Sequence, residues 1–120
     1  MIEVPVSTPQ KAIIVQIEVT SLQKDQSAIN AFTEFKDLSR SSGVEILGEI
    51  SGKQDVPLAS HFLKKGKIEE IKRFVEETCA EIVIFNHTLS PSQERNLENE
   101  FKGRVVDRTG LILDIFASRA

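Results

Sequence analysis

The chain has 120 residues, about the size of one compact domain, and its 40% hydrophobic and 28% charged residues are ordinary for a soluble globular protein. Its formal net charge of −3 excludes a strong whole-molecule attraction to nucleic acid, so that any contact with RNA needs a local basic patch. The single cysteine, Cys79, excludes an internal disulfide and a multi-cysteine zinc site, and fits a reducing compartment.

Residues 1–11 contain Pro5, Pro9 and several small polar residues, which is typical of a loose N-terminal leader. They lack the basic start and the apolar run of a secretory signal. The longest apolar stretches of the chain fall far below the roughly 20 residues that a membrane-spanning helix needs. We therefore expect a cytoplasmic chain with no membrane span and with one domain over residues 12–120.

The first half of this domain is predicted to hold two strand–helix units. Residues 12–19 are rich in β-branched side chains and do not alternate at first, which is typical of a strand buried on both faces. Apolar side chains recur at helical spacing over residues 28–42, and Gly43 stands where a helix would end. Residues 44–50 predict the second strand, and residues 67–79 predict the second helix.

Two more units follow. Residues 82–85 are short and wholly apolar, and predict the third strand. Ser90 precedes a proline and is followed three residues later by Gln93, a pattern that predicts a helix beginning with a capping box. Residues 105–106 predict the fourth strand, and the apolar residues of 109–120 predict a last helix.

Strands that are joined through helices run parallel, with right-handed crossovers. We therefore predict an α/β fold: a four-stranded parallel sheet with helices on both faces. By analogy with doubly wound folds, we expect the strand order 2-1-3-4. The apolar last helix either covers a face of this sheet or leads toward a further domain, and the two interpretations are compatible.

No motif predicts catalysis by this chain. There is no glycine-rich run that ends in Gly-Lys-Ser/Thr, no GxGxxG and no Gly-x-Ser-x-Gly elbow. His61 and His87 do not belong to a metal-binding spacing. Cys79 follows an amphipathic helix, and we interpret it as a small buried apolar residue rather than a nucleophile. We expect no catalytic residue, metal site or cofactor within these 120 residues.

Lys64, Lys65 and Lys67 form a cluster at the start of the second predicted helix. The N-terminus of a helix presents unpaired N–H groups and a partial positive charge, and lysines there add to an anion site. The phosphate of RNA or of a nucleotide is the ligand that this chemistry favours. A solvated surface without a ligand is the alternative interpretation.

A second cluster follows two predicted strands, with Asn86 and His87 after the third, and Asp107, Arg108 and Thr109 after the fourth. In parallel sheets the binding crevice lies beyond the carboxyl ends of the strands. These residues are therefore candidates for binding a ligand. In the alternative interpretation Asp107 or Thr109 caps the last helix, Arg108 pairs with a carboxylate, and His87 serves packing or hydrogen bonding.

Two blocks of the sequence resemble the N-terminal domain of the HflX family of ribosome-associated GTPases. They are LSPSQERNLE (residues 89–98) and VVDRTGLILDIFASRA (residues 105–120). Residues 62–67 resemble a third block of the family, an aromatic-x-Gly-x-Gly-Lys run that leads into a helix. Lys64 here replaces the first glycine, which weakens the case for a glycine-rich phosphate cradle and adds a positive charge. The resemblance covers residues 12–120.

The resemblance implies a larger protein, in which this α/β domain precedes a helical linker and a P-loop GTPase domain. GTP and Mg²⁺ would be bound by that GTPase domain, whose sequence is absent here. The implied partner is the large ribosomal subunit with its ribosomal RNA, in ribosome splitting or rescue under stress, and this domain would be an RNA- and ribosome-docking module. An independent nucleotide-binding domain, for ATP or GTP, and a purely structural interdomain scaffold remain the alternatives.

Overall fold

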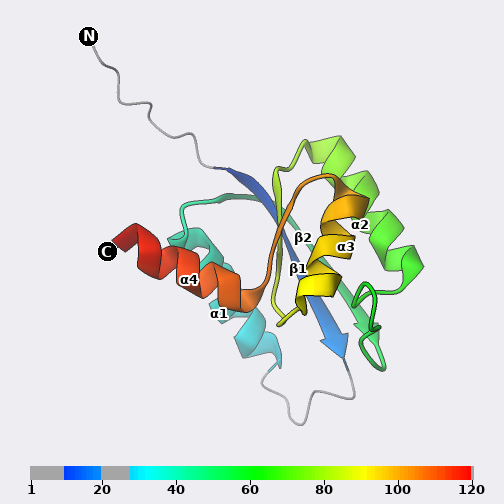
Figure 1. Cartoon of the computed structure of the whole chain (residues 1–120). Helices are drawn as coiled ribbons and strands as arrows, with labels where there is room; N and C mark the ends of the chain where they lie inside the picture. Colours follow the sequence, from blue (N-terminus) through cyan, green and yellow to red (C-terminus); the bar gives the residue numbers. More distant parts are fainter. Residues whose placement is uncertain (1–9, 20–27, 120) are drawn as a thin grey trace.

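The computed structural model of the chain describes residues 10–19 and 28–119, with side chains for residues 10–19 and 34–113. Strands and helices alternate through this part (Figure 1). The predicted leader falls mostly on residues 1–9, outside the described residues. The elements in chain order are β1 (Lys11–Val19), α1 (Ala28–Ser41), β2 (Glu45–Gln54), α2 (Lys65–Thr78), β3 (Ile82–Phe85), α3 (Pro91–Phe101), β4 (Arg104–Val106) and α4 (Arg108–Arg119).

The four strands form one parallel sheet in the order β2-β1-β3-β4, which confirms the predicted fold class and strand order. β1 is central and pairs with β2 along its whole length. On its other side it pairs with β3 only from Ala12↔Ile82 through Val15↔Phe85. The last part of β1, from Gln16 to Val19, therefore runs past the end of β3 without a strand neighbour on that side.

Helices cover both faces of the sheet, as predicted (Figure 1). On one face, Ile13, Val15 and Ile17 of β1 pack in a core to which α2 and α3 contribute. On the other face, Ala12 and Ile14 pack in a smaller core with residues of α1 and α4. This explains the continuous apolar start of β1, because successive residues of a strand point to opposite faces. Among the described residues, no helix is both long enough and apolar enough to cross a bilayer.

The predicted end of the second strand at Ile50 was wrong, because β2 continues to Gln54. Its last four residues pair with β1, from Ser51↔Gln16 through Gln54↔Val19. β2 is an edge strand with one neighbour, so its polar end can remain partly exposed while its backbone is still paired. A run of apolar residues indicates that side chains are buried. It does not indicate where a strand ends when the last residues are polar and are held by backbone hydrogen bonds alone, as here.

Cys79 is exposed, so the prediction of a buried position was wrong. α2 ends at Thr78, and Cys79 is its C-cap in the left-handed conformation, with φ of 57° and its N–H donating to Val75 O. The left-handed turn rotates the residue away from the apolar stripe of the helix. The helical spacing that placed Cys79 on the buried face therefore no longer applies at this position.

The capping box predicted at the start of α3 is confirmed. Ser90 Oγ accepts a hydrogen bond from the Gln93 N–H at 3.1 Å, and Gln93 Oε1 accepts one from the Ser90 N–H at 2.8 Å. Pro91 occupies the first position of the helix. These residues fix the start of α3 at the edge of the sheet where the candidate site lies.

Candidate functional site

Both predicted clusters lie at the carboxyl edge of the sheet. Asn86 and His87 follow β3, residues 107–109 lead from β4 into α4, and residues 64–67 begin α2 after β2. The ring of Phe62, just before α2, lies 4.8 Å from the ring of His87. The structure therefore connects the lysine cluster to the strand-end cluster through this contact.

His87 occupies the place that a longer β3 would fill. Its Nε2 accepts a hydrogen bond from the Ile17 N–H at 3.0 Å, on the part of β1 that runs past β3. Burial and, to a smaller extent, the positive charge of Arg108 lower the pKa of His87 from 6.5 to about 4. The ring is therefore neutral at pH 7, with its proton on Nδ1. His87 acts here as a hydrogen-bond partner of the sheet, as the structural interpretation expected.

Asn86 is a buried polar residue next to the end of β1. Its N–H donates to Val15 O at 3.0 Å, and its Nδ2 donates to Gln16 Oε1. Its Oδ1 is buried and accepts no hydrogen bond from the described residues. A buried acceptor without a donor is unusual in proteins. The carboxyl edge therefore contains one acceptor that a ligand or water could satisfy.

Asp107 uses both carboxylate oxygens to hold backbone N–H groups. Oδ1 accepts from Gly110 N at 2.8 Å, as an N-cap of α4 does, and Oδ2 accepts from Leu89 N at 3.0 Å in the connection before α3. This geometry favours the capping interpretation for Asp107. The side chains of Arg108 and Thr109 are exposed beside it, and their binding of a ligand stays a prediction.

The three lysines of the first cluster differ in their surroundings. Lys64 and Lys65 are exposed. Lys67 is half-buried, and its Nζ donates to Ser51 O at 3.0 Å and pairs with the Glu70 carboxylate at 2.9 Å. Lys67 therefore attaches α2 to β2, whereas Lys64 and Lys65 are available to a partner.

The start of α2 is open and positively polarised. Lys64 is its N-cap and makes no side-chain hydrogen bond to the helix, and the first turn contains no acidic residue. A Cβ placed on Gly66 would have no neighbour within 4 Å. The N–H groups of a first turn carry a partial positive charge that favours anions. The helix end and the two exposed lysines therefore form an anion-attracting surface.

Residues 55–63, which we call the 55–63 loop, connect β2 to the lysine cluster in a closed turn. Leu58 and Phe62 exchange two backbone hydrogen bonds of 3.0 Å, and Phe62 takes a left-handed φ of 66°. The buried Gln54 side chain donates from Nε2 to Val56 O and to Phe62 O, each at 2.8 Å. The last residue of β2 therefore holds the loop near both of its ends.

Two side chains of α3 also hold the 55–63 loop. Gln93 Nε2 donates to Leu58 O at 2.7 Å, and Asn96 Nδ2 donates to Ser60 O at 2.7 Å. Sequence reasoning missed this role for Gln93 and Asn96. The capping-box pattern predicts only the hydrogen bond that Gln93 Oε1 accepts from the Ser90 N–H. No local pattern indicates that the amide nitrogens of Gln93 and Asn96 donate to carbonyl groups of the 55–63 loop.

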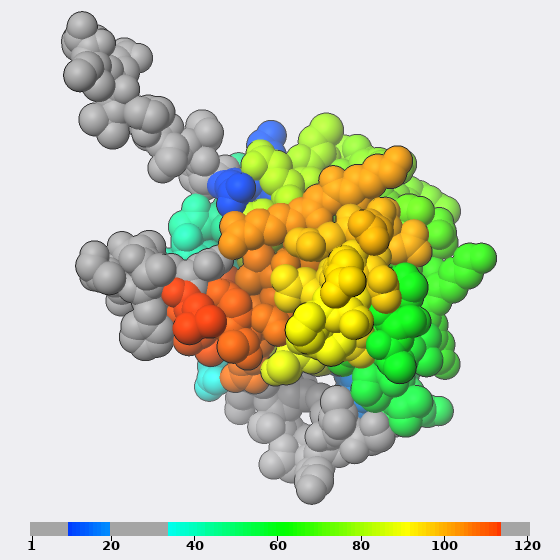
Figure 2. Space-filling model, viewed as in Figure 1, coloured from blue at the N-terminus to red at the C-terminus, as the bar shows by residue number. Residues whose placement is uncertain are grey.

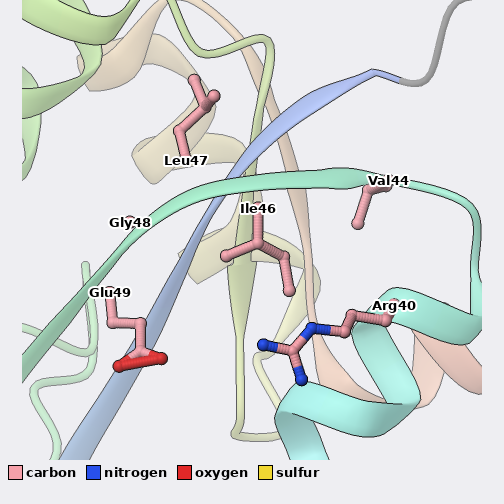
Figure 3. Close-up of a pocket in the computed structure, with 6 residues that line it drawn as sticks. All are labelled: Arg40, Val44, Ile46, Leu47, Gly48 and Glu49. Atoms are coloured by element: carbon pink, nitrogen blue, oxygen red, sulfur yellow. The ribbon is translucent and has the colours of Figure 1, made fainter.

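A separate groove of about 580 Å³ lies beside the first half of β2, away from the carboxyl edge (Figure 3). Ile46 lies on the same side of the strand as the Arg40 guanidinium of α1, while Leu47 lies on the other side. Val44, Gly48 and Glu49 complete the lining of the groove.

A metal site is not found in the described part of the chain. Across its side chains, no three His, Cys, Asp or Glu residues gather where they could hold a metal ion.

Residues 30–117 match the family model described as GTP-binding GTPase N-terminal. The chain belongs to the family of HflX GTPase N-terminal domains. It is 47% identical over 111 residues to GTPase HflX of Escherichia coli (strain K12), an alignment that covers 92% of this chain and 25% of that protein. It is 41% identical over 111 residues to GTPase HflX of Caldanaerobacter subterraneus subsp. tengcongensis, again over 92% and 25%. The chain thus spans about a quarter of the length of these HflX relatives.

Solved structures share the fold of this HflX-type domain. A complex of SsGBP with GDP has a TM-score of 0.67 and 20% identity, over 92% of this chain and 30% of that chain. A GTP-binding protein from the hyperthermophilic archaeon Sulfolobus solfataricus, in complex with GDP, has a TM-score of 0.63 and 19% identity. The match covers 90% of this chain and 30% of that chain. At this identity the likeness concerns the fold alone.

Proposed function

We propose that this chain is the ribosome-docking module of an HflX-type GTPase, and that it binds RNA of the large ribosomal subunit. The observation that carries the proposal is the open start of α2, where Lys64 and Lys65 are exposed beside uncapped N–H groups. Phosphate groups are the anions that such a surface suits. Because the whole chain has a net charge of −3, this local surface has to supply the attraction.

In this proposal the chemistry belongs to another part of the protein. The relatives are named GTPases and are about four times longer than the aligned region, whereas this sequence contains no Gly-Lys-Ser/Thr phosphate loop. GTP and Mg²⁺ would be bound by a GTPase domain that follows a helical linker. Docking by the present domain would place that GTPase on the ribosome during splitting or rescue under stress. An interdomain scaffold role is compatible with it, since Leu113 of α4 is 63% exposed.

Exchanging both exposed lysines for glutamate tests the anion surface. We expect the K64E/K65E variant to bind large ribosomal subunits at least about tenfold more weakly, because two phosphate contacts are lost and replaced by repulsion. The slope of log affinity against log salt should fall by about 2, since each contact releases close to one counterion. Sedimentation with purified large subunits over a salt series measures both quantities.

The matched control is the K11E/K102E variant, which has the same change in net charge. Lys11 and Lys102 are exposed at the opposite, amino edge of the sheet. We expect this variant to keep most of the affinity and the salt slope. Equal losses in the two variants would show that only the net charge matters, and an unchanged K64E/K65E variant would refute the proposed surface.

Nucleotide binding at the carboxyl edge is the second candidate function, and the buried Asn86 Oδ1 without a donor is the observation that favours it. A nucleobase amine or a ribose hydroxyl could donate to this oxygen. Calorimetric titration of the chain with ATP and GTP distinguishes the two functions. The absence of heat at millimolar nucleotide would remove this candidate and leave RNA docking.

A further inference from the structure

We propose that Lys67 and Gly52 are positioning residues of the docking surface, and that Lys67 itself does not bind phosphate. The Lys67 side chain lies across the backbone of Gly52 and anchors the first turn of α2 to β2. This inference rests on the proposed docking function, because the turn that Lys67 anchors presents Lys64 and Lys65. It divides the lysine cluster into one anchor and two phosphate contacts.

Lys67 is the first residue of α2 that packs against the rest of the domain. Lys65 and Gly66 precede it in the helix and are exposed, as is the N-cap Lys64. The Lys67 side chain is 23% exposed, and the next residue, Ile68, is buried in the core. The exposed first turn is therefore attached to the domain at Lys67 and Ile68.

The ammonium group of Lys67 already has two partners. Its Nζ donates to Ser51 O of β2 at 3.0 Å and to Glu70 Oε1 at 2.9 Å. Glu70 lies three residues further along α2, where the two side chains share one face of the helix. A phosphate at Lys67 would compete with this carboxylate for the charge and with Ser51 O for a donor. Lys67 is therefore suited to holding the turn rather than to attracting RNA.

Gly52 provides the space that this anchor needs. A Cβ at position 52 would lie 2.8 Å from Lys67 Cε and 3.0 Å from Lys67 Nζ, and the first distance is shorter than real Cβ contacts. A larger residue would therefore displace the end of the Lys67 side chain from Ser51 O. Glycine weakens the interior of a strand, and the close approach of another group is a recognised reason for its presence there. The contact with Lys67 supplies that reason for Gly52.

The anchor fixes the start of α2 beside the strand-end cluster. Gly52 pairs with Ile17 of β1, and the Ile17 N–H donates to His87. In Figure 2 the green atoms of the 55–63 loop and of the start of α2 lie at the surface, beside the yellow atoms of α3. A turn that is fixed before RNA binds avoids much of the entropy cost of ordering it on binding. We therefore expect the anchor to raise the affinity without adding a phosphate contact.

Lys67→Met tests whether Lys67 is an anchor or a phosphate contact, because methionine keeps an apolar stem and has neither charge nor donor. We expect large subunits to bind about two- to fivefold more weakly, because the turn is less well fixed. The slope of log affinity against log salt should stay unchanged. A fall of the slope by about 1 would show that Lys67 binds phosphate, and would overturn the proposal.

The matched control is Lys72→Met on the same helix. Lys72 pairs with Glu69 at 3.8 Å and with Glu100 at 3.7 Å, and it makes no contact with β2 among the described interactions. We expect this variant to keep both the affinity and the salt slope. A loss equal to that of Lys67→Met would show that the lost charge, rather than the anchor, weakens binding, and would contradict the positioning role.

Gly52→Ala tests the second positioning residue without changing any charge. We expect a loss of affinity similar to that of Lys67→Met, because the new Cβ displaces the Lys67 side chain. The G52A/K67M double variant should bind no more weakly than Lys67→Met, since two residues that act through one contact are not additive. Full affinity of Gly52→Ala, or a further loss in the double variant, would overturn the role of Gly52.

Hydrogen exchange of the free chain tests the anchor separately from docking. The Ile68 N–H donates to Lys64 O at 3.1 Å across the first turn of α2. We expect the Ile68 amide to exchange about two- to tenfold faster in Lys67→Met and in Gly52→Ala, because the turn opens more often. The amides of α3 should keep their rates, which distinguishes local opening from a general loss of stability.

The two measurements have separable failures. Unchanged exchange at Ile68 in both variants would overturn the anchor even if the chain binds large subunits. Faster exchange at Ile68 in a chain that binds no large subunits would retain the anchor and refute the docking function. Faster exchange together with weaker docking and an unchanged salt slope is the result that we expect.

Discussion

Replacing Asp107 by alanine is expected to lower the free energy of unfolding by about 3 kcal/mol, since the carboxylate makes two charge-assisted hydrogen bonds that each contribute about 1.5 kcal/mol or more. Asp107 is 8% exposed, so water cannot readily replace it. The N–H groups of Leu89 and Gly110 would lose their acceptor. The change would loosen both the connection before α3 and the start of α4.

Urea denaturation followed by circular dichroism measures this loss, because the chain contains neither tryptophan nor tyrosine for a fluorescence assay. The control is Asp37→Ala, which removes the same charge from an exposed pair with Arg40 at 3.4 Å. Exposed pairs of this kind contribute about 0–1 kcal/mol. If Asp107→Ala were no more destabilising than Asp37→Ala, the described role of the carboxylate would be wrong.

The free energy of unfolding should also fall as the pH is lowered from about 6.5 to about 4, because of His87. Its pKa is lowered to about 4 in the folded chain, against 6.5 for an unperturbed histidine. Between these two pH values the His87 imidazole is protonated in the unfolded chain and neutral in the folded chain. Lowering the pH therefore favours unfolding. The contribution is complete above pH 6.5 and is lost toward pH 4. It amounts to about 3 kcal/mol, at about 1.4 kcal/mol for each pH unit.

His87→Gln isolates this effect, because the amide oxygen of glutamine can accept from the Ile17 N–H and does not titrate. We expect the variant to show a smaller loss of stability than the unmodified chain over the same pH range. His61→Gln changes the other histidine of the chain. We expect this variant to lose as much unfolding free energy over this pH range as the unmodified chain does. Identical pH profiles for His87→Gln and the unmodified chain would contradict the assigned hydrogen bond. Carboxylates contribute to the pH profile of every variant. The relevant quantity is therefore the difference between the profile of His87→Gln and that of the unmodified chain.

The architecture could be predicted because its causes are local. The buried start of β1 shows as an unbroken apolar run, and the start of α3 shows as Ser90, a proline and Gln93. Once strands and helices alternate, chain connectivity requires parallel pairing. The end of β2 at Gln54 and the exposed Cys79 escaped prediction, because backbone pairing and a left-handed C-cap determine them rather than apolar spacing.

The candidate residues could be named from sequence, but their positions relative to one another and their contacts could not. The residue types at the strand ends and at the start of the second helix indicated two separate clusters, and the structure shows that both lie at one edge of the sheet. The partner of His87 depends on the register by which β1 runs past β3, and sequence does not reveal it. The amides of Gln93 and Asn96 reach carbonyl groups of a loop more than 30 residues earlier in the chain. Such contacts exist only in the folded domain.

Binding of the unmodified chain to purified large ribosomal subunits, with small subunits in parallel, tests the docking function most directly. We expect association with large subunits at low salt, a linear fall of log affinity with log salt, and weaker association with small subunits. No association with large subunits at low salt, or equal affinity for both subunits, would contradict the assignment of this domain as a docking module.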